Sequence, residues 1–266
     1  MEDPERRFDR IERLIGPQAL ARLRRSHVMV VGAGGVGSWA AESLARSGVG
    51  RLSIVDFDTV CIRNFNRQLQ ALSGNVGKQK APLLAERLRL INPEADVRGL
   101  AAFFNEDTCA ALMAERPDFV IDAIDHVTSK CFLIRYCREQ KIPMVVSTGS
   151  GGRVDPTRVQ VADLARTDVD PLARAIRDIL KKKFGFPMRA LFNIPAVFSA
   201  EPPTQPYAVG DQTECKSGCL CPQGENEFQN CGKKSVVMGT AAFVTGAFGL
   251  ACAAVAVKSL TTCTNP

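Results

Sequence analysis

Glycines at residues 32–37 have the spacing of a phosphate-binding turn. The motif G-x-G-x-x-G, with one extra glycine, is formed by Gly32, Gly34, Gly35 and Gly37. It comes directly after the apolar run 27–31 and before a segment of helical pattern. A turn in this context brings backbone N–H groups and a helix N-terminus toward a phosphate. The motif therefore predicts a nucleotide site, and by itself it leaves NAD, FAD, SAM and ATP open.

An acidic residue and a polar segment follow the second apolar run, 52–55. Asp56 lies nineteen residues after Gly37, where an acid accepts hydrogen bonds from ribose hydroxyls. The polar segment supplies further candidate nucleotide-binding residues: Asp58, Asn64, Arg67, Gln68 and, further on, Lys80. A dehydrogenase has no need of such a cluster, because the glycine turn already holds its pyrophosphate. Two cations such as Arg67 and Lys80 would neutralise charge on the phosphates that leave a triphosphate.

Asp125 ends the segment FVIDAID and is the third candidate catalytic residue, beside Arg67 and Lys80. It is expected at the carboxyl end of a strand, where open parallel sheets bind their ligands. A carboxylate there would hold Mg²⁺ between phosphate oxygens. The next residue, His126, lies near the phosphates or is an ordinary loop residue, and the sequence leaves both open. The chain lacks G-x-x-x-x-G-K-[ST], which excludes a P-loop enzyme.

Composition indicates a moderately basic protein of a reducing compartment. The chain has 266 residues, ten cysteines and a formal net charge of +6. The charged N-terminus MEDPERRFDR lacks the apolar core of a signal peptide, so we expect a cytoplasmic protein with mostly free thiols. A basic charge suits a nucleic-acid partner, but many other enzymes share it. One cysteine cluster lacks the paired C-x-x-C spacing of a zinc site, so free thiols are expected there, with metal binding as the alternative. Its members are Cys215, Cys219, Cys221 and Cys231.

Apolar runs and helical patterns alternate along most of the chain. Strands are expected at 27–31, 52–55, 96–100, 119–123, 143–147 and 159–164. Helices are expected at 8–25, 37–47, 78–90, 106–115, 128–140 and 170–184. The last of these helices has Asp170 as its N-cap and Pro171 at its first position. The alternation predicts an α/β fold with a Rossmann-like, doubly wound, mostly parallel sheet.

We expect two parts that are continuous as one domain: an ATP-binding adenylation part at 1–155 and a substrate-side extension at 156–266. Residues 190–231 are rich in proline and glycine and are predicted to form a loop over the site. Residues 236–257 carry no charge and are about long enough to span a bilayer. Their many Ala, Gly and Thr residues favour a terminal apolar helix packed inside the protein, with membrane contact as the weaker alternative.

The combined motifs resemble the ubiquitin-activating-enzyme-like superfamily. The resemblance rests on residues 32–37, DFDTVCIRNFNRQ, GKQK, INPE and IDAID. It implies that Asp56 binds ribose, that Asn64, Arg67 and Lys80 hold phosphates, and that Asp125 binds Mg²⁺. In RFDRIERLIG, Arg10 matches an arginine that reaches the ATP of a neighbouring subunit, which implies a homodimer.

The second half narrows the resemblance to one branch. The segment GGRVDPTRVQVADLARTDVDPLARAIRDILKKKFG and the later VFSAE are similar to the tRNA threonylcarbamoyladenosine dehydratases. That branch uses ATP to activate the carboxylate of N6-threonylcarbamoyladenosine next to the anticodon. An internal nucleophile then closes on the carbonyl, and AMP and pyrophosphate leave. A tRNA substrate would make phosphate contacts from helix 170–184 about as plausible as an ordinary solvated face. The cations concerned are Arg174, Arg177, Lys181, Lys182 and Lys183.

Two other functions stay open on sequence grounds. The first is an adenylating enzyme for a ubiquitin-like sulfur carrier, which would need a zinc site or a thiol acceptor; a sulfur-transfer protein partner is open for the dehydratase as well. The second is an NAD-dependent oxidoreductase or NAD-binding protein. It would leave Arg67 and Lys80 without a role.

Overall fold

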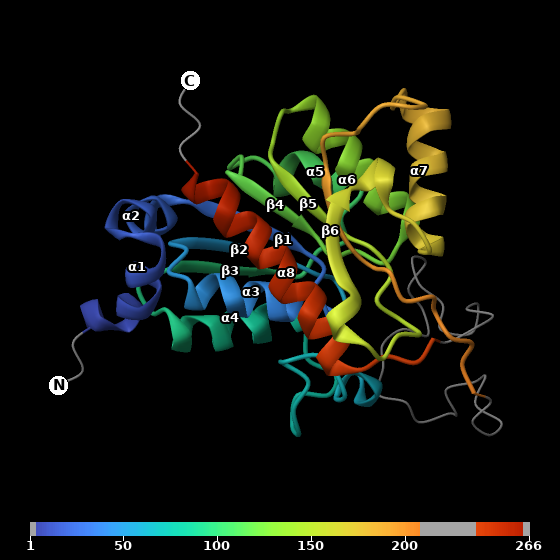
Figure 1. Cartoon of the computed structure of the whole chain (residues 1–266). Coiled ribbons are helices and arrows are strands. Elements are labelled where there is room, and N and C mark those ends of the chain that lie inside the picture. The colour runs from blue at the N-terminus through green and yellow to red at the C-terminus, as the bar shows by residue number, and fades with distance from the viewer. Residues whose placement is uncertain (1–3, 208–237, 263–266) are drawn as a thin grey trace.

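A seven-stranded sheet forms the centre of the computed structural model, which describes residues 4–207 and 238–262 (Figure 1). Its strands are β1 (His27–Val31), β2 (Arg51–Val55), β3 (Asp96–Leu100), β4 (Phe119–Asp122), β5 (Met144–Ser147), β6 (Val159–Asp163) and β7 (Pro195–Ser199). The order across the sheet is β3-β2-β1-β4-β5-β7-β6, and every neighbouring pair is parallel except β6 with β7. The predicted mostly parallel, Rossmann-like α/β fold is thereby confirmed.

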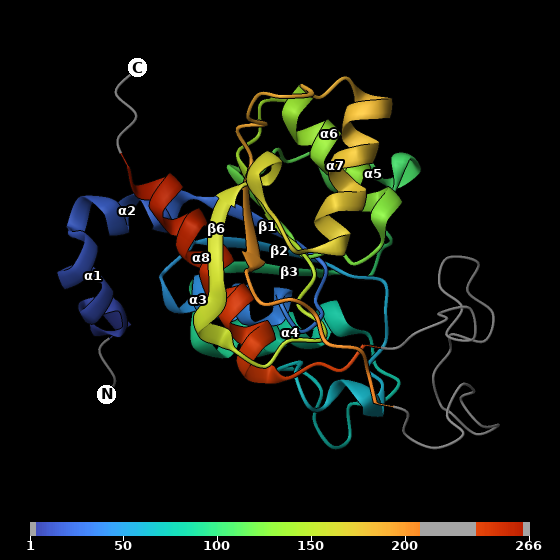
Figure 2. The ribbon, with the colours of Figure 1, turned by 45° about the vertical axis from the view of Figure 1, so that its right-hand side comes forward.

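Helices cover both faces of this sheet (Figure 2). One face carries α3 (Gly37–Arg46), α4 (Lys80–Ile91) and α8 (Ala242–Thr261), and the other carries α5 (Glu106–Leu112), α6 (Val127–Glu139) and α7 (Pro171–Phe184). All five residues of β1 are buried. Val28 and Val30 join the first core, whereas Met29 and Val31 join the second, because successive side chains of a strand point to opposite faces.

The N-terminal region folds as two helices, so the single helix predicted for 8–25 was wrong. A 3-10 turn (Pro4–Phe8) leads into α1 (Asp9–Ile15), and α2 (Pro17–Arg25) follows. Gly16 between them has φ +85°, a left-handed conformation that ends α1. Pro17 cannot donate a hydrogen bond to the preceding turn, so it begins a new helix instead.

The segment after residue 190 contains a strand, so the prediction of a loop throughout 190–231 was also wrong. Strand β7 lies inside the sheet between β5 and β6, and Ala196 to Ser199 are buried. The apolar residues AVF are the sequence signal for this strand, but the neighbouring prolines favour the prediction of a loop. Pro195 begins the strand, a position that tolerates its missing N–H. Residues 208–231 of the predicted loop, and with them the cysteine cluster, lie outside the described residues.

The apolar helix α8 is packed against the sheet and α3. It contacts β4, β5, β6 and β7 as well as α2 and α3. The close approach to α3 depends on small residues: a Cβ on Gly249 would lie 2.4 Å from the Val36 carbonyl oxygen, and one on Gly246 would touch the Trp39 ring. By length and composition α8 could cross a membrane, and 44% of its most apolar 18-residue stretch is buried inside the protein. Its contacts here are those of a core helix.

Short turns link the remaining elements. Three further 3-10 turns occur at Ile62–Asn64, Pro156–Arg158 and Leu164–Arg166. The predicted cap of α7 is confirmed, because a side-chain oxygen of Asp170 accepts the N–H of Ala173 at 2.6 Å and Pro171 is the first helical residue.

Candidate functional site

The glycine turn lies between the end of β1 and the start of α3. Gly32 has φ +99°, and its N–H donates to the Val55 carbonyl at 2.8 Å. A Cβ there would lie 2.6 Å from the Ala123 carbonyl oxygen, and a Cβ on Gly37 would lie 1.7 Å from that of Gly32. Both glycines are therefore required for packing. A Cβ on Gly34 would meet nothing within 4 Å, so the turn faces open space at that residue.

Asp56 is tied to the glycine turn by its carboxylate. Its two oxygens accept the N–H groups of Ala33 at 2.6 Å and of Asp58 at 2.8 Å. Burial raises the pKa of Asp56 to about 6, Lys80 opposes this rise, and Asp58 adds to it. The predicted ribose-binding acid thus lies at the carboxyl end of β2, directly beside the turn.

Lys80 is the first residue of α4 and points back toward the end of β2. Its Nζ lies 2.8 Å from an Asp58 carboxylate oxygen, and its side chain is 6% exposed. An isolated bridge between Thr59 and Gln79 holds the two segments together just outside this pair. Lys80 therefore lies beside Asp58 at the end of β2, and its part in nucleotide binding stays a prediction.

Arg67 lies against the glycine turn at Gly35. A Cβ on Gly35 would lie 3.1 Å from the Arg67 Cγ, so the arginine stem passes over the turn. Its Nη1 donates to the Arg63 carbonyl at 2.8 Å and to the Asn66 side chain at 2.9 Å. The Trp39 indole N–H donates to the Arg67 carbonyl at 3.1 Å. These contacts fix both the backbone and the guanidinium.

Asp125 lies in the turn that follows β4 and is exposed. Burial lowers the pKa of Arg67, and the negative charge of Asp125 opposes this lowering. The same turn contacts the glycines through Ala123. His126 caps α6, because its Nδ1 accepts the Ser129 N–H at 3.3 Å, and its ring packs on Phe103. The capping role accounts for His126 without any phosphate contact.

Three amides complete the surroundings of the glycine turn. Asn64 is buried, and its side-chain oxygen accepts the Cys61 N–H at 2.9 Å. Gln68 is buried with a side-chain oxygen that has no hydrogen-bond partner within the described part of the chain. Gln70, which sequence reasoning missed, donates to the Ala33 carbonyl at 2.6 Å. Only the folded contact with residue 33 reveals that Gln70 supports the turn.

Arg10 does not join this group. It is exposed on α1, which packs on α2 at the edge where the strands begin (Figure 1). The N–H of Gly50, just before β2, donates to the Leu23 carbonyl of α2. The nucleotide-site candidates instead lie beyond the carboxyl ends of β1, β2 and β4. The five-residue strands β1 and β2 are about 16 Å long, so this separates the candidates from Arg10.

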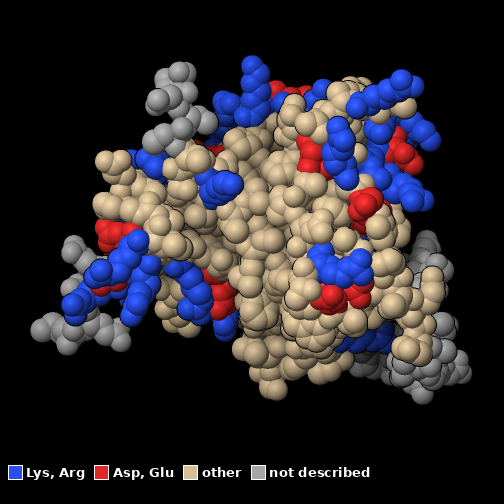
Figure 3. Space-filling model, viewed as in Figure 1, with Lys and Arg blue, Asp and Glu red and all other residues tan. Residues whose placement is uncertain are grey.

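The cations of α7 divide into two groups. Arg174, Lys182 and Lys183 are exposed, and Figure 3 shows basic side chains gathered around this helix. Arg177 instead donates to the Thr167 hydroxyl, and the Lys181 ammonium lies 5.9 Å from the centre of the Phe192 ring. The exposed three are therefore available to a ligand, whereas the other two already serve packing.

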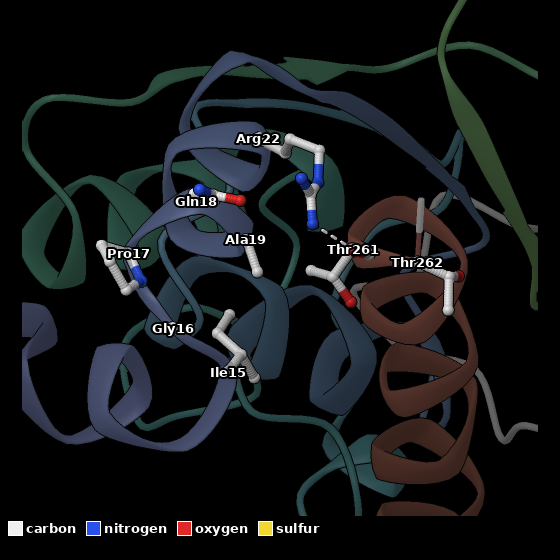
Figure 4. A pocket seen from close by; sticks show the side chains of 8 residues that line it. All are labelled: Ile15, Gly16, Pro17, Gln18, Ala19, Arg22, Thr261 and Thr262. Atoms are coloured by element: carbon white, nitrogen blue, oxygen red, sulfur yellow. Dashed lines mark hydrogen bonds between the residues drawn. The ribbon is translucent and has the colours of Figure 1, made fainter. Parts of the chain in front are cut away.

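The pocket in Figure 4 lies between residues 15–19 and the end of α8, and Arg22 is the one charged residue among those of the described chain that line it. The Arg22 guanidinium donates to the Thr261 carbonyl, so it caps α8. Across residues 4–207 and 238–262, no three His, Cys, Asp or Glu residues are grouped to hold a metal ion.

Comparison with known proteins gives consistent matches over nearly the whole chain. The model of the ThiF family matches residues 8–266. The chain is 42% identical to the tRNA threonylcarbamoyladenosine dehydratase of Haemophilus influenzae, over 92% of this chain and 89% of that protein. It is 34% identical to the molybdopterin-synthase adenylyltransferase of Escherichia coli, but over only 58% of this chain and 59% of that protein.

Solved structures give the same result. The Escherichia coli tRNA N6-threonylcarbamoyladenosine dehydratase TcdA in complex with ATP superposes with a TM-score of 0.83 at 40% identity. The match covers 97% of this chain and 96% of that one. Its complex with AMP gives a TM-score of 0.84 at 41% identity.

Proposed function

Because this chain belongs to the ThiF family, we propose that it dehydrates N6-threonylcarbamoyladenosine in tRNA, using ATP to adenylate the carboxylate. The observation that carries this proposal is the match to TcdA over 97% of the chain, including a homologous complex with ATP. Asp56 and Arg67 each contact the glycine turn, Lys80 lies beside Asp58, and a Cβ on Gly34 would meet nothing within 4 Å. That arrangement suits a nucleotide with several phosphates.

Each side chain has a distinct part in the proposed reaction. Asp56 accepts hydrogen bonds from the ribose, and the turn donates its N–H groups to phosphate. The substrate carboxylate attacks the α-phosphorus, and pyrophosphate leaves. Arg67 and Lys80 stabilise the negative charge that develops on the α-phosphate and the leaving group. An internal nitrogen or oxygen of the substrate then attacks the activated carbonyl, AMP leaves, and a proton is released.

The residues present fit a magnesium ion carried by the triphosphate. Mg²⁺ keeps several waters and is commonly held by one or two carboxylates together with substrate phosphates, so one acidic side chain is enough. Asp125 is exposed in the turn after β4, and its negative charge opposes the lowering of the Arg67 pKa by burial. Bound there, the ion would neutralise phosphate charge; Asp125 would orient it.

The proposed active protein is a homodimer. Arg10 is held at the amino edge of its own sheet by the packing of α1 on α2, too far to reach the glycine turn of the same chain. A second copy could place its Arg10 at that turn. Such an exchange of one residue between subunits fits a symmetric pair.

The tRNA is proposed to bind along α7. Arg174, Lys182 and Lys183 would contact phosphates, which position a nucleic acid without reading its sequence. The two parts of the chain would act as one unit, since β7 from the second part lies between β5 and β6. We place this reaction in the cytoplasm, where its tRNA substrate would be met.

Pyrophosphate exchange into ATP tests the proposed function against its alternatives. Exchange should require tRNA that carries N6-threonylcarbamoyladenosine and should not occur with tRNA that lacks the modification. Exchange that needs a small carrier protein with a Gly-Gly end would instead indicate a sulfur-carrier adenylating enzyme. Binding of NAD without binding of ATP would indicate the nicotinamide alternative.

A further inference from the structure

A fully buried ion pair lies beneath the turn that carries Asp125. The Lys130 ammonium is 2.7 Å from an Asp122 carboxylate oxygen, and both side chains are 0% exposed. Asp122 is the last residue of β4, and Lys130 lies in the first turns of α6. Buried lysines are rare unless paired, and such pairs seldom add net stability over apolar residues of similar volume. Stability alone therefore does not account for this pair.

The pair connects the two ends of the Asp125 turn. The Asp122 carboxylate also accepts the Ile124 N–H at 3.1 Å, and the Lys130 ammonium lies 3.4 Å from the Asp122 carbonyl oxygen. At the far end, the Lys130 N–H donates to the His126 carbonyl at 3.0 Å. The residues between 122 and 130 are thus fixed to β4 on one side and to α6 on the other.

The same turn borders the glycine loop. The Ala123 carbonyl oxygen would lie 2.6 Å from a Cβ on Gly32, and the Ala123 side chain 3.3 Å from one on Gly37. A shift of this turn would therefore move Asp125 and press on the glycines together. Displacements of about 1 Å at a reacting group can cost about 100-fold in rate.

We propose that Lys130 and Asp122 are positioning residues, whose ion pair holds the turn that presents Asp125 to the metal–nucleotide complex. The inference rests on the proposed function for the role of Asp125, and on geometry alone for the ordering of the turn. The ion pair would keep the acidic turn rigid at the edge of the proposed phosphate site.

The test separates positioning from stability by removing both charges at once. Asp122→Asn with Lys130→Met keeps the shapes and the acceptor for the Ile124 N–H, and leaves no lone buried charge. We expect this double variant to melt within about 5 °C of the wild type. We expect kcat of the tRNA-dependent reaction to fall at least about tenfold, and half-saturating Mg²⁺ to rise by a similar factor.

A matched control is Ile134→Ala, which opens a cavity under the same helix while leaving both charges of the pair in place. Ile134 is fully buried, so this variant should lose stability yet keep its kcat and its Mg²⁺ dependence at a temperature where it stays folded. If the double variant instead keeps the wild-type kcat and Mg²⁺ dependence, the pair is structural only and the proposal is overturned.

Amide hydrogen exchange decides the inference independently of catalysis. The N–H groups of residues 123–127 should exchange at least about tenfold faster in the double variant than in the wild type and the Ile134→Ala control. Unchanged exchange there overturns the proposal. A wild type that shows no tRNA-dependent chemistry would overturn the proposed function instead, while the exchange rates would still report on the turn.

Discussion

The Lys80 ammonium lies 2.8 Å from an Asp58 carboxylate oxygen in the free protein, so a carboxylate holds this cation where phosphates are proposed to bind. Asp58 also follows Asp56, whose carboxylate accepts the Asp58 N–H. The pair keeps a largely buried ammonium compensated before the nucleotide arrives. The arriving triphosphate would take the place of the Asp58 carboxylate next to Lys80, or bind beside it. The Lys80 ammonium could therefore contact a phosphate without refolding.

Removing either cation should slow adenylation. We expect Arg67→Ala and Lys80→Ala each to reduce kcat by about 100-fold or more, because each removes stabilisation that develops in the transition state. Circular dichroism and melting curves should show that both variants remain folded. Single-turnover formation of AMP measures the effect. Near-normal turnover in either variant would remove that residue from the phosphate site.

Two glycines of the same motif should respond differently to alanine. Gly34→Ala adds a Cβ to open space, so we expect an unchanged melting temperature and at least about tenfold weaker ATP binding. Gly37→Ala would place its Cβ 1.7 Å from the Gly32 carbonyl oxygen, so it should fail to fold or melt far lower. Calorimetry with ATP measures both. Wild-type ATP affinity in Gly34→Ala would show that no phosphate approaches that residue.

Two inactive variants should restore activity when mixed, if Arg10 acts on the neighbouring subunit. In a mixed dimer of Arg10→Ala with Lys80→Ala, one site has an intact pocket and receives an intact Arg10 from its partner. Random exchange of subunits at equal amounts should recover about a quarter of the wild-type activity. The mixture is compared with each variant alone. Activity no higher than the average of the two would mean that Arg10 does not act between subunits.

The exposed cations of α7 should bind tRNA through its phosphates. We expect the triple change of Arg174, Lys182 and Lys183 to Gln to weaken tRNA binding and to reduce its dependence on salt. Each lost phosphate contact lowers the slope of log K against log salt by about 0.9 on a duplex. An equal loss of charge elsewhere serves as the control: Arg24, Arg25 and Lys141 to Gln, all exposed. Equal slopes in the two triple variants would exclude α7 as the contact.

Local signals explain what could be predicted from the sequence. The glycine motif directly follows β1, and Asp56 directly follows β2. Neighbouring parallel strands bring their carboxyl ends together, so these features meet. Asp170 and Pro171 define a helix start within two residues. The contacts that were missed join distant segments. Gln70 meets Ala33, Trp39 meets Arg67, and β7 enters the sheet beside a strand nearly fifty residues earlier. No periodicity within a short window reports such pairings.

The most direct test of carboxylate adenylation follows an oxygen atom. Modified tRNA carrying ¹⁸O in the carboxylate of its threonylcarbamoyl group is converted with ATP, and the products are analysed by mass spectrometry. Attack of the carboxylate on the α-phosphorus, followed by ring closure at the carbonyl, should leave one ¹⁸O in AMP and none in pyrophosphate. Unlabelled AMP, or label in inorganic phosphate, would contradict attack at the α-phosphorus and with it the assigned roles of Arg67 and Lys80.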